Sequence, residues 1–432
     1  MGQARIEGRG ATLTFGLIAL ALTMALIVFS EAGFHAAVSG LRLFFDVVLP
    51  SLLPFFILSE LLLALGVVHF LGEWLEPIMR PVFNVPGVGS FVFSMGLAAG
   101  YPMDAVLTAK FRRQNLCTRI EGERLLSFTN SADPLFIFGA VAVAMFHNPA
   151  LGAALAFGHY LGALGVGLVF RFHGRRDEER VPGDGGAWGA AARRPSIAAR
   201  ALDAVLRARV EDGRPIMTVM NQAIVESART LLVIASFICL FSVVLRVVAT
   251  TGALAVLAVP MAALLHLFGL PATLAHAAVT GLFEIDLGTA AAAVAHAPLV
   301  ARLAVAGAII AWSGLSVHAQ VLSVLAGTDI RIGPYYVARV LHAVLAGILT
   351  AVALGPGRPV MAMLARAMHG VPVLAMGAAE HGGLMARFWA SLGIGTEWAA
   401  LAVLVPVAAV VLYVGARGIA RTRLVAWFVA RT

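Results

Sequence analysis

The sequence predicts an all-α polytopic membrane protein: an inverted repeat of about 3+3 spans with two re-entrant hairpins and two broken helices. Apolar residues make up 60% of the 432-residue chain and charged residues only 12%, whereas soluble domains carry roughly 25% charged residues. Apolar runs of bilayer-spanning length recur along the chain, and polar stretches interrupt two of them at corresponding places. Together these observations exclude an ordinary soluble enzyme.

The first apolar run, residues 11–31, is expected to be a retained transmembrane helix. It follows Arg5 and Arg9, as the apolar core of a signal peptide would, but it has spanning length and lacks a small-residue cleavage site before Glu31. The other runs of spanning length cover residues 42–68, 124–146, 150–172, 227–249, 299–325, 334–354 and 397–416.

Two further apolar runs are interrupted and are expected to be re-entrant hairpins, which enter and leave the membrane on one side. Residues 89–110 contain the stretch GYPMD at 100–104, and residues 272–297 contain EIDLG at 284–288. A short amphipathic piece precedes each hairpin, at 73–86 and 251–269, and is expected to lie in the membrane interface.

The basic residues support this layout. With eight full spans and two hairpins, roughly four-fifths of all Lys and Arg fall on one side, including the loop from Lys110 to Arg124 and the linker 173–222. The positive-inside rule then places both termini in the cytoplasm. Counting either hairpin as a full span would put basic clusters on both sides. The net charge of +8 is therefore read as a topology signal, and no nucleic-acid partner is expected.

The chain contains an internal repeat. Residues near 41–172 and 226–354 share the order span, interfacial piece, hairpin, broken span, span, with local matches at an offset of about 180 residues. Each copy of the repeat crosses the membrane three times, an odd number, so the two copies have opposite topology. The expected segments are an N-terminal helix (1–40), a first repeat (41–172), an Arg-rich cytoplasmic linker (173–225), a second repeat (226–355), an extracytoplasmic linker (356–396) and a C-terminal helix with a basic tail (397–432).

The two polar breaks are SFTNSADP at 127–134 and SGLSVHAQ at 313–320. A helix that breaks in hydrocarbon leaves backbone groups unpaired unless protein or a water-filled cavity satisfies them. Paired broken helices in two halves point to a transporter's binding site. Hairpin tips and half-helix N-termini are expected to meet near the membrane midplane, where free N–H groups suit a carboxylate. The alternative is that Asn130, Ser131, Ser313, Ser316 and Gln320 only satisfy the broken backbone or pack helices.

Four acids are predicted at membrane depth: Asp104, Asp133, Glu284 and Asp286. An intramembrane carboxylate is costly and is a candidate for binding a proton, a cation or a partner. Local capping of backbone N–H groups is the alternative for Asp133 and Asp286. His318 could titrate or bind an anion, or be a hydrogen-bonded structural histidine.

Several chemistries have no sequence signal. Cys117 lies in a basic loop and Cys239 in an apolar span, so neither a disulfide nor a metal site is expected. No nucleotide-binding P-loop, zinc motif or elbow serine appears. We expect no enzyme activity and no cofactor apart from a coupling proton or cation. An intramembrane hydrolase built on Asp133 or His318, and a non-transporting membrane scaffold, are the alternatives from other classes.

At the first hairpin and the helix after it, the chain resembles a known family. The residues that carry the resemblance are GYP at 100–102, ERLLSFTNS at 123–131, PLFIFG at 134–139 and WSGLSVHAQ at 312–320. They resemble sporulation integral membrane proteins with a nucleoside-recognition (Gate) domain, over roughly residues 40–355. One departure affects the first hairpin: the family commonly reads Gly-Tyr-Pro-x-Gly-Ala-Lys, whereas this chain has Asp104 in place of the small residue and Val106 in place of the lysine.

The resemblance implies a fold similar to concentrative nucleoside transporters and transport of dipicolinate (pyridine-2,6-dicarboxylate) across the outer forespore membrane; the bacterial inner membrane is the alternative location. Nucleosides or another small organic anion are alternative substrates. Besides substrate and lipid, a second copy of the chain or other sporulation membrane proteins are candidate partners. The candidate substrate-binding residues are Gly100, Tyr101, Asn130, Ser131, Ser313, Gly314, Ser316 and Gln320, and the candidate coupling residues are Asp104, Asp133, Glu284, Asp286 and His318.

Overall fold

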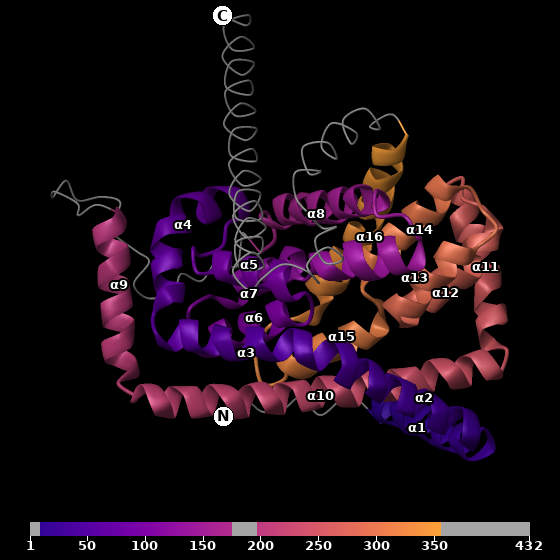
Figure 1. The fold of residues 1–432 in the computed structure, drawn as a ribbon, viewed down its shortest axis with the longest axis horizontal. Helices are drawn as coiled ribbons and strands as arrows, with labels where there is room; N and C mark the ends of the chain where they lie inside the picture. The colour runs from indigo at the N-terminus through magenta and orange to yellow at the C-terminus, as the bar shows by residue number, and fades with distance from the viewer. Residues whose placement is uncertain (1–8, 175–196, 356–432) are drawn as a thin grey trace, which may run out of the picture. The chain divides into compact units, whose positions relative to one another are not determined.

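The computed structural model describes residues 9–174 and 197–355, and within these ranges the chain is helical with no β-strand (Figure 1). Three short elements depart from α-helix: η1 and η2 are π-helical and η3 is a 3₁₀ turn. In chain order the elements are α1 (Arg9–Val28), α2 (Ser30–Leu43), η1 (Phe44–Val48), α3 (Leu49–Ala64), α4 (Val67–Phe83), α5 (Gly89–Ala99), α6 (Met103–Arg113), α7 (Arg119–Thr129), η2 (Leu135–Met145), α8 (Leu151–Phe170), α9 (Ile197–Asp212), α10 (Ile216–Thr250), α11 (Ala253–Leu267), η3 (Ala272–Leu274), α12 (Ala275–Phe283), α13 (Ile285–Val294), α14 (Leu299–Trp312), α15 (Gly314–Leu325) and α16 (Ile332–Leu354).

The described residues hold four helical segments long and apolar enough to cross a membrane, or up to six if each of two bent helix pairs counts as one span. The four are Leu151–Phe170, Ile216–Thr250, Leu299–Leu325 and Ile332–Leu354. They confirm the apolar runs expected at 150–172, 227–249, 299–325 and 334–354 as helices. The run expected at 397–416 lies outside the described residues, as does the linker at 356–396.

Part of the 173–225 linker is helical. Its residues 197–212 form α9, which packs against α4, and α10 begins at Ile216. Residues 216–225 contain neither proline nor glycine, so nothing in the sequence prevents the transmembrane helix from starting there. At about 1.5 Å per residue, the 35 residues of α10 exceed the roughly 30 Å hydrocarbon core, so this helix projects beyond it.

Both expected hairpins are pairs of short helices that pack against each other: α5 with α6, joined by residues 100–102, and α12 with α13, joined at Glu284. None of the four helices exceeds 11 residues, which is about half of what a span needs. In the second hairpin, a Cβ added to Gly288 would lie 2.3 Å from the Cα of Gly281. The two helices therefore approach more closely than any larger residue would allow.

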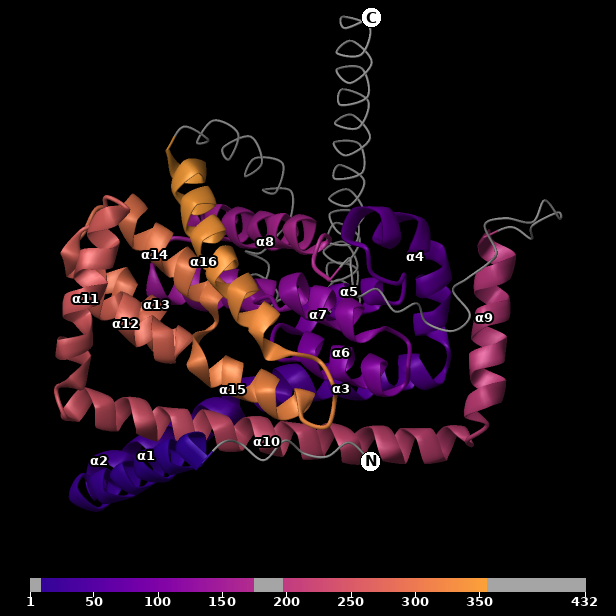
Figure 2. The same ribbon diagram turned by 180° about the vertical axis from the view of Figure 1, so that it is seen from behind.

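The described chain forms two compact units. Unit 1 contains residues up to Leu61 and Arg214–Val324, and unit 2 contains Leu62–Gly213 and the chain from Leu325. Each unit holds one hairpin and one helix break. In unit 1, α2 packs against α10. In unit 2, α16 crosses α8 in close contact and also touches α7 (Figure 2). The last described helix, α16, thus packs beside the first break.

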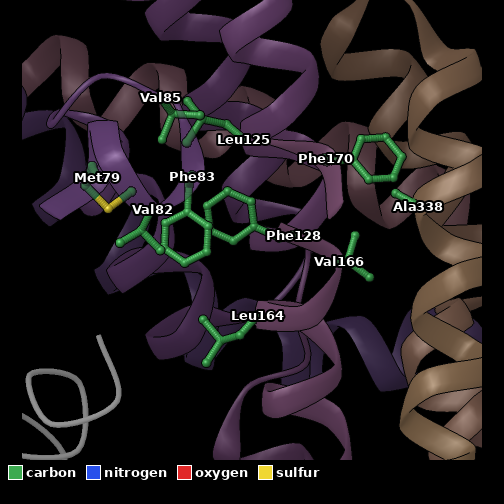
Figure 3. Close-up of a cluster of buried hydrophobic side chains, with 10 residues drawn as sticks. All are labelled: Met79, Val82, Phe83, Val85, Leu125, Phe128, Leu164, Val166, Phe170 and Ala338. Atoms are coloured by element: carbon green, nitrogen blue, oxygen red, sulfur yellow. The ribbon is translucent and has the colours of Figure 1, made fainter. Parts of the chain in front are cut away.

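A cluster of buried apolar side chains fixes α7 within unit 2 (Figure 3). Phe128 of α7 and Phe83 of α4 stack with ring centroids 4.6 Å apart, and Val166 and Phe170 come from α8. Truncating such a phenylalanine to alanine typically costs about 3–5 kcal/mol. The cluster therefore fixes the position of the last turn of α7, where the first break begins.

The other end of α7 is held by charge. The carboxylate of Glu123 is fully buried and accepts hydrogen bonds from Arg331 Nε at 2.8 Å and Nη2 at 3.0 Å, and from His173 Nε2 at 2.6 Å. Thr118 and Glu121 form a capping box at the start of the same helix, which satisfies two otherwise unpaired backbone donors. Arg331 precedes α16, so these contacts join the start of α7 to the start of α16.

Candidate functional site

The first break lies in unit 2, between the end of α7 at Thr129 and the start of η2. Asn130 leaves the helix with φ −67° and ψ 97°. Two features of the sequence favour the break: Asn and Ser side chains compete with the helix for backbone hydrogen bonds, and the residue before Pro134 disfavours helical backbone. Residues 127–132 are buried, so the freed backbone groups need partners inside the protein.

Arg339, in the middle of α16, partners the freed carbonyl groups. The side chain is fully buried, its Nη1 donates to the carbonyl oxygen of Asn130 at 2.6 Å, and its Nη2 donates to the carbonyl oxygen of Ser127. A cation at the C-terminal end of a helix also interacts favourably with the helix dipole. Arg339 therefore closes the end of α7 that the break leaves open.

Two buried histidines lie on the other side of the break. The main-chain N–H of Ala132 donates to His159 Nε2 at 3.0 Å, and Ser131 Oγ lies 3.0 Å from the same nitrogen. His342 Nε2 lies 2.7 Å from the carbonyl oxygen of His159, and His342 Nδ1 lies 3.1 Å from Arg339 Nη1. Because His159 Nε2 and His342 Nδ1 both face donors, these partners fix both rings as neutral tautomers.

The side chain of Asn130 connects the break to the first hairpin. Its Nδ2 donates to Asp104 Oδ1 at 3.1 Å, and its Oδ1 accepts from the Tyr335 hydroxyl at 3.3 Å. Thr129 Oγ1 lies 3.4 Å from the second oxygen of Asp104, which is a long contact. Asp104 is fully buried on α6. Asn130 is therefore held by the protein itself through its carbonyl oxygen, its amide nitrogen and its amide oxygen.

Glycines let the first hairpin approach the break. A Cβ on Gly96 would lie 2.7 Å from the carbonyl oxygen of Thr129, and one on Gly100 would lie 2.8 Å from Asp133 Oδ2. Gly100 also has a φ of +72°, which L side chains rarely adopt. Asp133 Oδ1 accepts the main-chain N–H of Phe136 at 2.9 Å. Asp133 thus caps the helix after the break, the local role that its sequence context offered as an alternative.

The second break, in unit 1, turns the backbone through two consecutive residues of positive φ. Ser313 has a φ of +69° and Gly314 a φ of +75°, so two consecutive residues are left-handed, and the strained one is the non-glycine. The carbonyl oxygen of Trp312 accepts from Ser313 Oγ at 2.6 Å and faces His318 Nε2 at 2.7 Å. His318 is therefore hydrogen-bonded to the backbone at the second break.

The tip of the second hairpin contacts this break directly. A Cβ on Gly314 would lie 3.1 Å from the carbonyl oxygen of Phe283 and 3.2 Å from the Cα of Glu284. The indole N–H of Trp312 donates to the carbonyl oxygen of Leu282 at 3.1 Å. Glu284 is the N-cap of α13, and its carboxylate accepts the main-chain N–H of Leu287 at 2.9 Å.

The two units share one arrangement: in each, a polar break rests on a hairpin tip through a left-handed glycine, and a carboxylate caps a helix start beside it. Unit 2 brings together Gly100, Asp104, Asn130, Ser131 and Asp133. Unit 1 brings together Ser313, Gly314, His318, Glu284 and Asp286. Tyr101 is half-buried in the turn of the first hairpin. Ser316 and Gln320 are buried on α15, one and two turns beyond the second break.

Sequence reasoning missed the partners of the first break. Arg339, His342 and Tyr335 lie within the apolar run 334–354, and His159 lies within 150–172. A charged residue inside a spanning run is itself a signal of function or of a buried partner, so Arg339 could have been found from the sequence. Within residues 9–174 and 197–355, no three His, Cys, Asp or Glu side chains gather closely enough to hold a metal ion.

Comparison with known proteins identifies relatives of this chain. Residues 45–165 match the family model described as Gate, nucleoside recognition. The chain is 44% identical over 343 residues to the sporulation integral membrane protein YlbJ of Bacillus subtilis (strain 168). The matched region covers 78% of this chain and 81% of YlbJ. Among solved structures, CNTnw in an inward-facing substrate-bound state is 19% identical, with a TM-score of 0.38 over 79% of this chain and 86% of CNTnw. A CNTnw variant in an outward-facing state is also 19% identical, with a TM-score of 0.37 over 80% and 84% of the two chains.

Proposed function

This chain belongs to the family of the sporulation integral membrane protein YlbJ, and we propose that it transports dipicolinate across the outer forespore membrane during sporulation. It is an integral membrane protein of transporter-like character, with a nucleoside-recognition match in its first half. The observation that carries the proposal is the pair of buried polar breaks, one in each unit, each beside the tip of a short hairpin.

The chemistry of the breaks suits an anion. The helices that start after a break, η2 and α15, begin with N–H groups that have no partner within the helix, and their dipoles favour negative charge. Dipicolinate carries two carboxylates that flank a pyridine nitrogen, so it offers several acceptors in one plane. Ser313, Ser316 and Gln320 at the second break, and Ser131 at the first, are buried donors that could bind them.

The acids constrain how an anion can be carried. Asp104, Asp133, Glu284 and Asp286 lie beside the breaks, and uncompensated carboxylates would repel a dicarboxylate. Asp104 has a cation near it, Arg339. For the second hairpin we propose that a proton or cation, taken up at Glu284 and Asp286, accompanies the substrate. Transport would then be secondary, driven by a gradient.

A nucleoside is the second candidate substrate, because the family model that matches residues 45–165 is described by nucleoside recognition. The deciding experiment is uptake by the full chain in proteoliposomes, with labelled dipicolinate and labelled uridine offered in parallel and protein-free liposomes as the control. Saturable uptake of dipicolinate with none of uridine supports the proposal, and the reverse result assigns the chain to nucleosides. No uptake of either would favour a non-transporting membrane scaffold.

A further inference from the structure

Arg339 is the one arginine that the structure places, fully buried, at the first break, and nothing in the sequence pattern of the breaks assigns it a role. It is connected to a second buried charge. The Asn130 carbonyl oxygen accepts from Arg339 Nη1 at 2.6 Å, and the Asn130 side-chain amide donates to Asp104 Oδ1 at 3.1 Å. One residue of the break thus lies between a buried cation and a buried anion, and the two charges also interact electrostatically.

We propose that Asp104 and Arg339 form an intramembrane charge pair, joined through Asn130, that sets the net charge at the first break and so determines which substrate charge the break accepts. The inference deepens the proposed function and rests on it for the substrate. Asp104 is in this view a specificity-determining counter-charge to Arg339, and the coupling of transport to ions falls to other acids.

Three observations support this assignment. Asp104 and Arg339 are both fully inaccessible to solvent, and a buried charge persists only when it is compensated. Asn130 is fixed in orientation, because the Tyr335 hydroxyl donates to its amide oxygen while Asp104 accepts from its amide nitrogen. Finally, the neighbouring rings of His159 and His342 are fixed as neutral by their partners, since His159 Nε2 accepts from Ala132 N–H and His342 Nδ1 faces Arg339. They add no charge that would upset the balance.

The first test is a stability cycle without ligand, on the full chain in detergent, with Asp104→Asn, Arg339→Gln and the double variant. If the two charges compensate each other, the double variant melts at a higher temperature than the sum of the single shifts predicts. Additive shifts would overturn the charge pair. Arg339→Met also removes the charge and replaces Arg339→Gln in the cycle where Arg339→Gln does not fold. Arg339→Lys keeps the charge but loses the two-pronged contact with the carbonyls of Ser127 and Asn130.

The second test is ligand selectivity, read as a thermal-shift titration with three probes: pyridine-2,6-dicarboxylate, the monoanion pyridine-2-carboxylate, and neutral uridine. Removing the Asp104 charge leaves Arg339 unbalanced, so Asp104→Asn should tighten binding of the dianion about tenfold, that of the monoanion by less, and that of uridine not at all. Arg339→Lys should melt earlier and keep the wild-type order of preference, which separates the charge of Arg339 from its structural contacts. Asp329→Asn removes a carboxylate from the solvent-exposed loop before α16 and is the matched control for net charge.

The outcomes distinguish the two proposals. If Asp104→Asn changes the affinity for all three probes equally, or for none of them, the proposal that the Asp104–Arg339 pair selects the substrate charge is wrong, even where the wild type binds dipicolinate. If neither the wild type nor any variant binds any probe, the transport proposal fails, and the stability cycle alone then decides whether the charge pair exists.

Discussion

Arg339 Nη1 lies 2.6 Å from the carbonyl oxygen of Asn130, a residue 209 positions earlier in the chain. A side chain of the last described helix, α16, therefore pairs the backbone carbonyl groups that the first helix break leaves open. A hydrogen bond that involves a charged group typically contributes about 1.5–3 kcal/mol. The geometry of the first break consequently depends on contacts within unit 2 as well as on its own local sequence.

The loop before α16 gives a pH-dependent prediction. Hydrogen bonds from Arg112 to Asp329, at 2.7 and 2.8 Å, lower the pKa of the Asp329 carboxyl below its usual value. A carboxyl whose pKa is lower in the folded state stabilises the fold above its unfolded pKa, and this stabilisation is lost as pH falls through the folded pKa. Because half of the Asp329 side chain is exposed, screening limits the effect to no more than about 1 kcal/mol.

Asp329→Asn should therefore lower the melting temperature slightly near pH 7, and the difference from the wild type should shrink as the pH falls from 7 through the lowered pKa of Asp329. Differential scanning fluorimetry of both proteins over this range measures it. A constant difference at every pH would mean that the Asp329 charge contributes nothing. Asp203→Asn, which removes an ion pair on the surface of α9, is the matched control.

Much of this architecture was accessible from the sequence, because it follows from composition and spacing. The first hairpin and both breaks appear where Gly, Pro, Ser and Asn interrupt apolar runs, at 100–102, 130–134 and 313, and the second hairpin turns at the acidic residue Glu284. It was harder to decide from the sequence which of several neighbouring polar residues caps a helix. The sequence offers capping in the second hairpin as the alternative role of Asp286, whereas it is the Glu284 carboxylate that accepts the main-chain N–H of Leu287, because the N-cap is set by where α12 ends.

Contacts distant in the sequence could not be predicted from one chain. No local pattern indicates that Asn130 is held by Asp104 from α6 and by Tyr335 from α16. Composition and spacing indicate where the apolar helices lie along the chain, while the pairing of α16 with α7 and α8 depends on packing of the whole unit. This is also why the arginine count, which treats basic residues as loop signals, gave no place to Arg339.

Gly314→Ala is expected to lower stability by about 1–3 kcal/mol. The residue has a φ of +75°, and an added Cβ would crowd the carbonyl oxygen of Phe283 at 3.1 Å. Thermal melting of the detergent-solubilised protein measures the loss. Gly333→Ala, at a helical glycine whose Cβ would meet nothing within 4 Å, should be neutral. Equal melting temperatures for the two variants would show that the second break does not depend on its contact with the hairpin tip.

Glu284 is expected to couple transport to protons or a cation. Its carboxylate caps α13 through the main-chain N–H of Leu287 at 2.9 Å, and a glutamine oxygen can accept the same hydrogen bond. Glu284→Gln should therefore keep the fold while removing the titratable charge, so that uptake in proteoliposomes loses its pH or cation dependence. Glu226→Gln, at an exposed position of α10, should retain the dependence. An unchanged dependence at the wild-type rate in Glu284→Gln would leave Glu284 as a helix cap alone.

The last prediction separates binding from structure at the two breaks. Ser313 Oγ donates locally, to the carbonyl oxygen of the preceding residue Trp312, so Ser313→Ala should change the melting temperature little. If the hydroxyl binds the substrate, the same change should weaken dipicolinate binding by about 1–3 kcal/mol, the usual cost of losing a hydrogen bond to a charged group. Ser94→Ala, which removes a comparable bond to the carbonyl oxygen of Ser90 on α5, is the control.

Asn130→Ala should differ from Ser313→Ala in its effect on the melting temperature. The Asn130 amide donates to Asp104 and accepts from Tyr335, so its removal should lower both the melting temperature and the affinity for dipicolinate. A ligand-induced thermal-shift titration on each variant reads both quantities from one experiment. If both variants lost stability while the affinity of the folded protein stayed at the wild-type value, the breaks would be structural and the substrate would bind elsewhere. Loss of affinity in Ser313→Ala at an unchanged melting temperature is the result that only a substrate contact explains.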